Sequence, residues 1–145
     1  MEKIVFVCLG NICRSPMAEF VMKDLVEKAG NESKFLIESR ATSSWEHGNP
    51  IHSGTQTKLK EQKIAFDLHK GSQKISSEDF YEFDKIIAMD ESNLENLRKM
   101  APEGTSQKIA MLLEQGVPDP WFTGDFQETY QLVKTSYQRL LDEIV

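Results

Sequence analysis

The chain has 145 residues, 39% of them hydrophobic and 28% charged, and this length predicts one domain, residues 1–145, with a core that needs no disulfide or metal. Its 23 acidic and 17 basic residues give a net charge of −6, which argues against a nucleic-acid-binding surface. The apolar run near the N-terminus is too short for a signal peptide or a membrane span, so we expect a cytoplasmic protein that does not enter a membrane.

Short apolar runs predict four strands, at residues 4–8, 35–39, 85–89 and 108–113. The first run is apolar throughout and rich in β-branched residues, which is typical of a strand buried on both faces. Helical patterns separate these runs. Such alternation favours an open parallel α/β sheet with right-handed crossovers, in which ligands bind at the carboxyl ends of the strands.

The first helix is predicted with Ser15 as its N-cap, Pro16 as its first residue and Gly30 just beyond its end. A short helix is predicted over residues 54–62, and a capped turn at Ser76.

Later in the chain, Asp90 is predicted to cap a helix that ends at Pro102, and residues 116–124 are predicted to form a loop. The C-terminal helix is predicted from a capping box of Asp125 and Glu128. It carries one apolar stripe, formed by Phe126, Tyr130, Val133, Tyr137, Leu140, Leu141 and Ile144.

The segment VCLGNICRSP lies between the first predicted strand and the first predicted helix. Gly10 permits backbone conformations that other residues resist, so the N–H groups between Leu9 and Ser15 can turn inward around one anion. The helix adds its positive N-terminal end, and Arg14 adds a planar guanidinium that fits two phosphate oxygens. Cys8 lies at the base of this ring, where both features favour its thiolate form. The segment therefore predicts a phosphate pocket with a nucleophilic cysteine.

Less specific explanations exist for parts of this segment. A strand, a glycine loop and a helix occur together in many α/β domains, and a cysteine at the end of a buried strand is usually a small hydrophobic residue. Only a bound anion accounts for Cys8, Arg14 and Ser15 together, so we favour the phosphate pocket. A Walker-type nucleotide loop is excluded, because no lysine follows the glycine at the position that this motif requires.

The motif CLGNICRSP resembles the active-site signature of the low-molecular-weight protein tyrosine phosphatases, and the similarity continues through MDESN and DPW to the C-terminal helix. This resemblance implies a flavodoxin-like open four-stranded parallel sheet with helices on both faces. It also implies hydrolysis of phosphotyrosine through a cysteinyl-phosphate intermediate, without a metal or other cofactor. The expected partners are phosphotyrosine-containing proteins, tyrosine kinases among them, and the expected state is a monomer.

The resemblance also implies roles for individual residues. Cys8 matches the nucleophile and Arg14 the phosphate-binding arginine. The rest of the phosphate-binding loop is Leu9, Gly10, Asn11, Ile12, Cys13 and Ser15. Asn11 would hold this loop in shape through a polar network with Ser39 and His69; the alternative for His69 is a surface histidine near a polar turn.

Asp119, between two prolines, matches the general acid and base of the family. From its spacing alone, an Asx turn is the favoured explanation, and the resemblance to the Asp-Pro motif of the family reverses this preference. Trp45 and Trp121 are expected to wall a deep substrate pocket, with core packing as the alternative. Cys13 is expected to form a reversible disulfide with Cys8, and its alternative is a buried cysteine that fills space under the loop.

Other functions lack residues that they require. Thiol-dependent arsenate reductases share this fold and loop but need further cysteines, and none follows Cys13. A disulfide oxidoreductase would typically have a C-x-x-C motif, which is absent. A catalytically silent phosphotyrosine-binding module would be expected to lack Cys8 or Asp119. No metal-ligand spacing is found among the histidines His47, His52 and His69.

Overall fold

The computed structural model describes residues 1–144, so Val145, the last residue of the predicted domain, lies outside the described residues. Four parallel strands form a sheet in the order β2-β1-β3-β4 within the described part of the chain. The strands are β1 (Glu2–Cys8), β2 (Phe35–Ala41), β3 (Lys85–Ala88) and β4 (Ile109–Met111). This order gives the flavodoxin-like architecture that the sequence resemblance implied.

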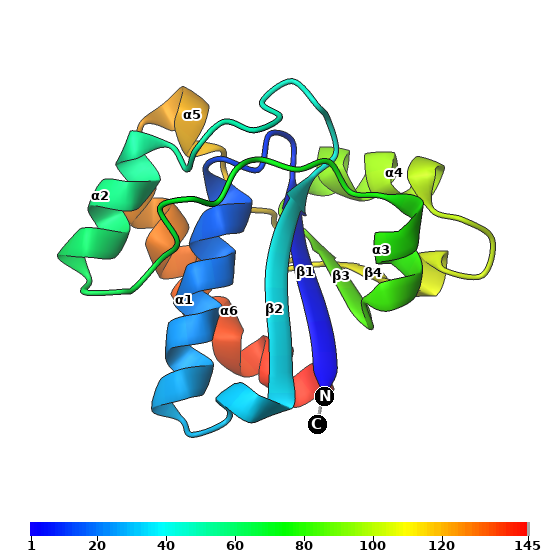
Figure 1. Ribbon diagram of the computed structural model, residues 1–145, viewed down its shortest axis with the longest axis horizontal. Helices are drawn as coiled ribbons and strands as arrows, with labels where there is room; N and C mark the ends of the chain where they lie inside the picture. The colour runs from blue at the N-terminus through cyan, green and yellow to red at the C-terminus, as the bar shows by residue number, and fades with distance from the viewer. Residues whose placement is uncertain (145) are drawn as a thin grey trace.

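Helices cover both faces of this sheet (Figure 1). They are α1 (Arg14–Lys28), α2 (Ser53–Glu61), α3 (Ser77–Glu82), α4 (Glu91–Met100), α5 (Pro120–Thr123) and α6 (Phe126–Ile144). In Figure 1, α1 and α6 lie on one face and α3 and α4 on the other. No helix within residues 1–144 is long and apolar enough to cross a membrane.

The side chains of β1 alternate between two buried apolar clusters. Phe6 and Cys8 join the cluster on the side of α1 and α6, and Val7 joins the cluster on the side of α3 and α4. All three side chains are buried, which confirms the predicted burial of β1 on both faces. Since β1 lies between β2 and β3, its carboxyl end at Cys8 is surrounded by other elements.

Several predicted helix boundaries are confirmed. The side chain of Asp90 accepts a hydrogen bond from Asn93 N at 2.8 Å and caps α4, which ends at Met100 before Pro102. Ser76 and Asp79 form a capping box at the start of α3.

The start of α1 differs from the prediction. The helix begins at Arg14, and its N-cap residue, Cys13, makes no side-chain capping bond. Ser15 is therefore inside the first turn, and its hydroxyl group faces Cys8 rather than the N–H groups of the helix. The first turn of α1 also lacks acidic side chains, so its positive end has no carboxylate from its own helix.

The chain before α6 also differs. Residues 120–123 form the short helix α5, where a loop was predicted. Only half of the expected capping box is present: Asp125 Oδ1 accepts from Glu128 N at 2.9 Å, whereas the N–H group of Asp125 donates to Thr123 Oγ1 at 3.1 Å. Strand β4 is shorter than predicted because Lys108 belongs to a 3₁₀ turn and Leu112 lies beyond the strand's end.

Candidate active site

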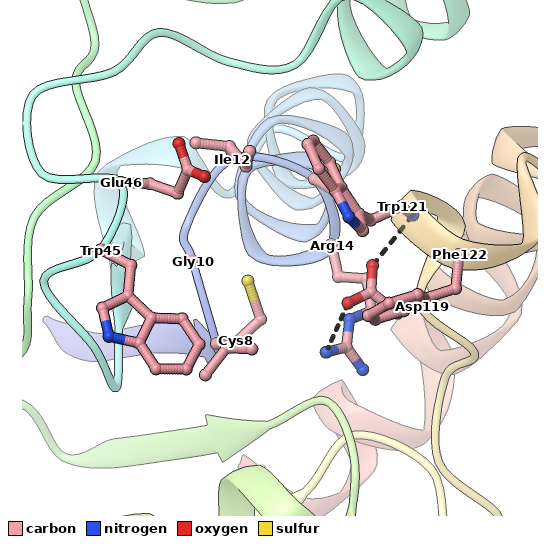
Figure 2. Close-up of a pocket in the computed structure, with 11 residues that line it drawn as sticks. Cys8, Gly10, Ile12, Arg14, Trp45, Glu46, Asp119, Trp121 and Phe122 are labelled. Carbon is pink, nitrogen blue, oxygen red and sulfur yellow. Dashed lines mark hydrogen bonds and ion pairs between the residues drawn. The ribbon is translucent and has the colours of Figure 1, made fainter.

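A pocket of about 200 Å³ opens at the carboxyl ends of the strands (Figure 2). Three segments contribute residues to its lining. They are residues 8–15, which we call the Cys8 loop; residues 45–46, which follow β2; and residues 116–124, which we call the Asp119 loop. The lining residues are Cys8, Leu9, Gly10, Ile12, Cys13, Arg14, Trp45, Glu46, Asp119, Trp121 and Phe122. The structure thus brings together the cysteine, the arginine, the aspartate and both tryptophans that the sequence singled out.

Cys8 forms the base of the pocket. Its residue is only 3% exposed, and its Sγ atom lies 3.1 Å from Ser15 Oγ. The N–H group of Asn11 donates to the same sulfur at 3.3 Å. Two polar groups therefore face the sulfur, which is an arrangement that stabilises negative charge on it.

Asn11 holds the Cys8 loop in an unusual conformation. Its φ of 55° lies in the left-handed region, which non-glycine residues rarely adopt but asparagine adopts most readily. Its Nδ2 group donates to Ser15 Oγ at 2.8 Å and to Ser39 Oγ at 3.0 Å, and its Oδ1 atom accepts from Gln73 N at 3.2 Å. These bonds from three parts of the chain hold the strained residue in place.

Gly10 serves a different purpose from the one predicted. The left-handed conformation belongs to Asn11, and Gly10 is not among the residues with positive φ. A Cβ atom at Gly10 would instead lie 3.3 Å from Cγ of Glu46, so glycine allows the close approach of the segment after β2. The carbonyl group of Gly10 accepts a 2.7 Å bond from Ser72 Oγ, which fixes this part of the loop.

The N–H groups of the Cys8 loop are largely unpaired with protein. The structure describes all of residues 9–15. Apart from hydrogen bonds within α1, the backbone N–H group of Asn11 is the one among them that donates to a protein acceptor. The uncapped end of α1 adjoins these groups. An anion above Cys8 would supply the acceptors that they lack.

Arg14 is buried beside Cys8 and held from two sides. Its Nη1 group donates to Asp90 Oδ2 at 2.6 Å and to the carbonyl oxygen of Val117 at 2.9 Å. Burial lowers the pKa of Arg14, but the negative charges of Cys8, Asp90 and Asp119 outweigh burial and raise this pKa above its usual value. The guanidinium therefore stays charged, with a fixed orientation at the pocket wall.

Asp90 is a site residue that the sequence analysis described only as a helix cap. Its Oδ1 atom caps α4 while its Oδ2 atom holds Arg14, so one carboxylate performs both tasks. Its position in the sequence could have indicated a site residue, because Asp90 is the second residue after the end of β3. Side chains at the carboxyl ends of adjacent parallel strands meet at one edge of the sheet.

Asp119 lies beside Arg14, across the pocket from Trp45 and Glu46, as Figure 2 shows. Its Oδ1 atom accepts from Trp121 N at 3.0 Å and caps α5, while its Oδ2 atom lies 3.5 Å from Nη2 of Arg14. The Asx turn and the site position expected from the sequence are therefore both present in one residue. The second oxygen pairs with Arg14 at the wall of the pocket that Asp119 lines.

Three aromatic side chains surround the mouth of the pocket. Trp45 is 80% exposed, Trp121 57% and Phe122 80%, so neither tryptophan packs in the core. All three line the pocket, and they come from opposite sides of it in Figure 2. Exposed aromatic rings around a buried thiol form a slot suited to an aromatic ligand.

A buried ionic network supports the Cys8 loop from α1. The hydroxyl group of Ser39 donates to Glu19 Oε1 at 2.6 Å, and Glu19 is only 3% exposed. Lys23 Nζ and Lys70 Nζ lie 2.6 and 3.1 Å from the Glu19 carboxylate. Neither Glu19 nor Lys70 was singled out from the sequence. Glu19 could have been noticed, because it is a carboxylate at a position of α1 that faces the core.

His69 does not join this network, which corrects the expectation for it. The residue is exposed, and its backbone N–H group bonds to Asp67 Oδ1 at 2.8 Å. The following residue, Lys70, reaches Glu19 and the carbonyl oxygen of Ser39 instead. The alternative reading, a surface histidine in a polar turn, agrees with its position.

Cys13 and Cys8 are both free thiols, both are buried, and both line the pocket. Burial is the main cause that raises the pKa of Cys13 to about 12, and the charges of Cys8 and Asp119 raise it further. At neutral pH the Cys13 thiol is therefore protonated.

A family profile described as low molecular weight phosphotyrosine protein phosphatase matches residues 3–145. The chain belongs to this family. It is 44% identical to the low molecular weight protein-tyrosine-phosphatase YfkJ of Bacillus subtilis, over 99% of this chain and 96% of YfkJ. It is 41% identical to PtpA of Staphylococcus saprophyticus, a protein of the same description, over 100% of this chain and 95% of PtpA.

A solved structure of the family has the same architecture. The crystal structure of SP-PTP, the low molecular weight protein tyrosine phosphatase of Streptococcus pyogenes, matches with a TM-score of 0.94 and 54% identity, over 100% of this chain and 94% of that chain. The expected fold and the expected enzyme class, a low molecular weight protein-tyrosine-phosphatase, are confirmed.

Proposed function

We propose that this protein hydrolyses phosphotyrosine in proteins through a covalent cysteinyl-phosphate intermediate, without a metal ion. The single observation that carries the proposal is the convergence on one pocket of a buried sulfur, unpaired loop N–H groups, a charged arginine and a carboxylate. Each of these groups has a task in transfer of a phosphoryl group, and the family to which the chain belongs supports that reaction.

In the first step, the Cys8 thiolate attacks phosphorus while the bond from phosphorus to the tyrosine oxygen breaks. The loop N–H groups and the Arg14 guanidinium bind the three equatorial oxygens. Tyrosine has a pKa of about 10 in water, so its oxygen leaves poorly as an anion. Asp119 therefore enters this step protonated and gives its proton to the leaving oxygen.

In the second step, the Asp119 carboxylate takes a proton from a water molecule, and the resulting hydroxide attacks the phosphorus of phosphocysteine. The sulfur–phosphorus bond breaks, and inorganic phosphate leaves the pocket. The departing Cys8 thiolate is stabilised by Ser15 Oγ and the N–H group of Asn11, which lie 3.1 and 3.3 Å from the sulfur. Asp119 ends this step protonated and ready for the next cycle.

The depth of the pocket would select the substrate. The sulfur lies at the base, and the aromatic side chains of Trp45, Trp121 and Phe122 stand at the mouth. A phosphorylated phenol spans this depth and stacks against the rings, whereas the short side chain of phosphoserine brings its peptide backbone against them.

We further propose that the substrates are phosphotyrosine-containing proteins, tyrosine kinases among them, and that the enzyme acts as a monomer in the cytoplasm. Two free thiols that line one pocket suit a reducing compartment. Under peroxide, Cys8 would be oxidised to a sulfenic acid. Attack by Cys13 would then release water and form a reversible disulfide.

The test is hydrolysis of p-nitrophenyl phosphate and of a phosphotyrosine peptide in excess EDTA, with vanadate as inhibitor. The wild-type protein should turn over both substrates, and Cys8→Ser should turn over neither. Trapping of a phosphorus-labelled protein after an acid quench would identify the intermediate. Turnover by Cys8→Ser at the wild-type rate would remove the covalent mechanism, and activity on phosphoserine or phosphoarginine peptides alone would remove the proposed substrate.

A further inference from the structure

His52 makes contacts with three separate parts of the site. Its backbone N–H group donates to the carbonyl oxygen of Ile12, in the Cys8 loop, at 2.8 Å. Its ring meets the ring of Trp121 edge to face, with centroids 5.5 Å apart and an interplanar angle of 81°. The same ring stacks on Phe126 of α6, at 5.2 Å and 22°. The residue therefore touches the Cys8 loop, the Asp119 loop and the C-terminal helix.

The orientation of the His52 ring is fixed by a hydrogen bond within its own turn. Its Nδ1 atom accepts from the N–H group of Gly54 at 3.0 Å, which caps α2. The ring is thus neutral in this conformation, with its proton on Nε2. Gly54 also lets Phe126 come close, because a Cβ atom at Gly54 would lie 2.3 Å from the Phe126 ring. His52 is held between its cap and Phe126, so it is a rigid support.

Trp121, in contrast, is more than half exposed and belongs to a helix of four residues. Its backbone N–H group bonds to Asp119 Oδ1, so the backbone of Trp121 and the carboxylate of Asp119 are held together at the start of α5. An exposed ring needs a rigid neighbour to keep one orientation, and the edge-to-face contact with His52 supplies one.

We propose that His52 is a positioning residue that sets the Trp121 wall of the pocket relative to the Cys8 loop, and with it the end of the Asp119 loop. In its effect on substrates, this inference rests on the function proposed above. His52 does not touch the reacting atoms, so it acts through Trp121. Its loss should weaken recognition of the aromatic ring of the substrate and leave recognition of the phosphate group intact.

Two substitutions separate the two tasks of the His52 side chain. His52→Asn keeps an oxygen that accepts from Gly54 N and caps α2 but removes the ring. His52→Phe keeps a ring between Trp121 and Phe126 but removes the cap acceptor. Both are made in a Trp45→Phe background, which leaves Trp121 as the one fluorescent tryptophan, since the sequence has two.

In His52→Asn, we expect iodide quenching of Trp121 fluorescence to rise and kcat/KM for a phosphotyrosine peptide to fall by roughly threefold to tenfold, the size of effect that one aromatic contact supports. Ki for inorganic phosphate, which reaches only the Cys8 loop, should not change. His52→Phe should restore the quenching and kcat/KM to the values of the background protein, while its Tm falls by a few degrees because the cap is lost.

Unchanged quenching and unchanged kcat/KM in His52→Asn would overturn the inference. So would equal losses in both variants, because a ring at position 52 would then not be what holds Trp121. An increase in the Ki of phosphate that parallels the loss of kcat/KM would place the effect in the Cys8 loop and also contradict it. If the wild-type protein, with Trp45 in place, fails to hydrolyse the peptide, the proposed function fails, and the quenching of the two variants still decides the role of His52.

Discussion

The hydroxyl group of Ser39 donates to the buried carboxylate of Glu19 at 2.6 Å, and this bond sets the direction of a chain of hydrogen bonds that ends at Cys8. A carboxylate can only accept, so Ser39 uses its proton on Glu19 and accepts from the amide of Asn11. The same amide donates to Ser15 Oγ, so the one proton of Ser15 is left for the sulfur of Cys8, 3.1 Å away, or for the carbonyl oxygen of Arg40, 3.3 Å away. Glu19 thus orients a chain of hydrogen bonds that reaches Cys8, a residue that it does not touch.

Glu19→Gln should break this order with little change in volume. Glutamine must turn its amide donor toward Ser39 or toward the lysines, all of which are donors at this site. We expect a loss of about 1–3 kcal/mol in the free energy of unfolding, measured in urea, together with a lower kcat. Wild-type stability and kcat in this variant would show that the polarity of the network has no effect on the loop.

Lys70 and Lys23 offer a matched pair for the same carboxylate. Lys70 is mostly buried, with a side chain 14% exposed, and it also donates to the carbonyl oxygen of Ser39, whereas the side chain of Lys23 is 44% exposed. Lys70→Met should therefore lower Tm and kcat more than Lys23→Met, because an exposed ion pair contributes little. Equal effects of the two substitutions would contradict this difference.

Asp119→Asn tests the proposed acid without removing the cap of α5, since asparagine can also accept from Trp121 N. Hydrolysis of phosphotyrosine should slow by about 10²–10⁴-fold, the usual contribution of a general acid. An ester whose leaving group is stable as an anion needs less protonation. Transfer of the phosphoryl group from such an ester to Cys8, measured as a pre-steady-state burst of the leaving group, should therefore slow much less. Equal losses in the two substrates would reject the role as acid.

Asp90→Asn tests the support of Arg14. Asparagine can still cap α4, but it replaces the charged partner that binds Nη1 at 2.6 Å. A hydrogen bond to a charged group contributes about 1.5–3 kcal/mol, so we expect kcat/KM to fall by roughly 10- to 100-fold. Ki for vanadate should rise with it, since Arg14 binds this anion too. The control is Asp84→Asn: Asp84 accepts from the backbone of Lys3, far from the pocket, and its loss should change neither value.

Cys13 gives a prediction on pH. Its pKa is raised to about 12 in the folded protein, against about 8.5 for a free cysteine. Between these values the unfolded chain has lost a proton that the folded chain keeps, so the free energy of unfolding falls as pH rises through this window. Cys13→Ser, which carries no titrating group there, should flatten this fall in urea unfolding series at pH 8 to 11. An unchanged slope would contradict the raised pKa.

The four strands and most helix ends could be predicted because each depends on residues close in sequence. The capping residues Ser76 and Asp90 and the apolar run of β1 contain their own signals. The start of α1 could not be predicted in the same way. Ser15 has the composition of an N-cap, but a buried sulfur and an asparagine from the loop attract its hydroxyl group more strongly than the helix does.

In the site, the residues that lie in a short sequence motif could be predicted, whereas the residues that support them through contacts could not. Cys8, Arg14 and Asp119 were identified with their neighbours. Glu19 and Lys70 contribute through contacts between segments far apart in sequence, and only the fold shows that Lys70, rather than His69, reaches Ser39.

The central place of β1 in the sheet has a consequence for the growing chain on the ribosome. Arg14 is synthesised more than a hundred residues before Val117 and Asp119, yet it donates to the carbonyl oxygen of Val117 and stands beside the carboxylate of Asp119. The nascent protein therefore carries Cys8 long before the pocket around it can form, and the pocket is completed only after Asp119 has been synthesised.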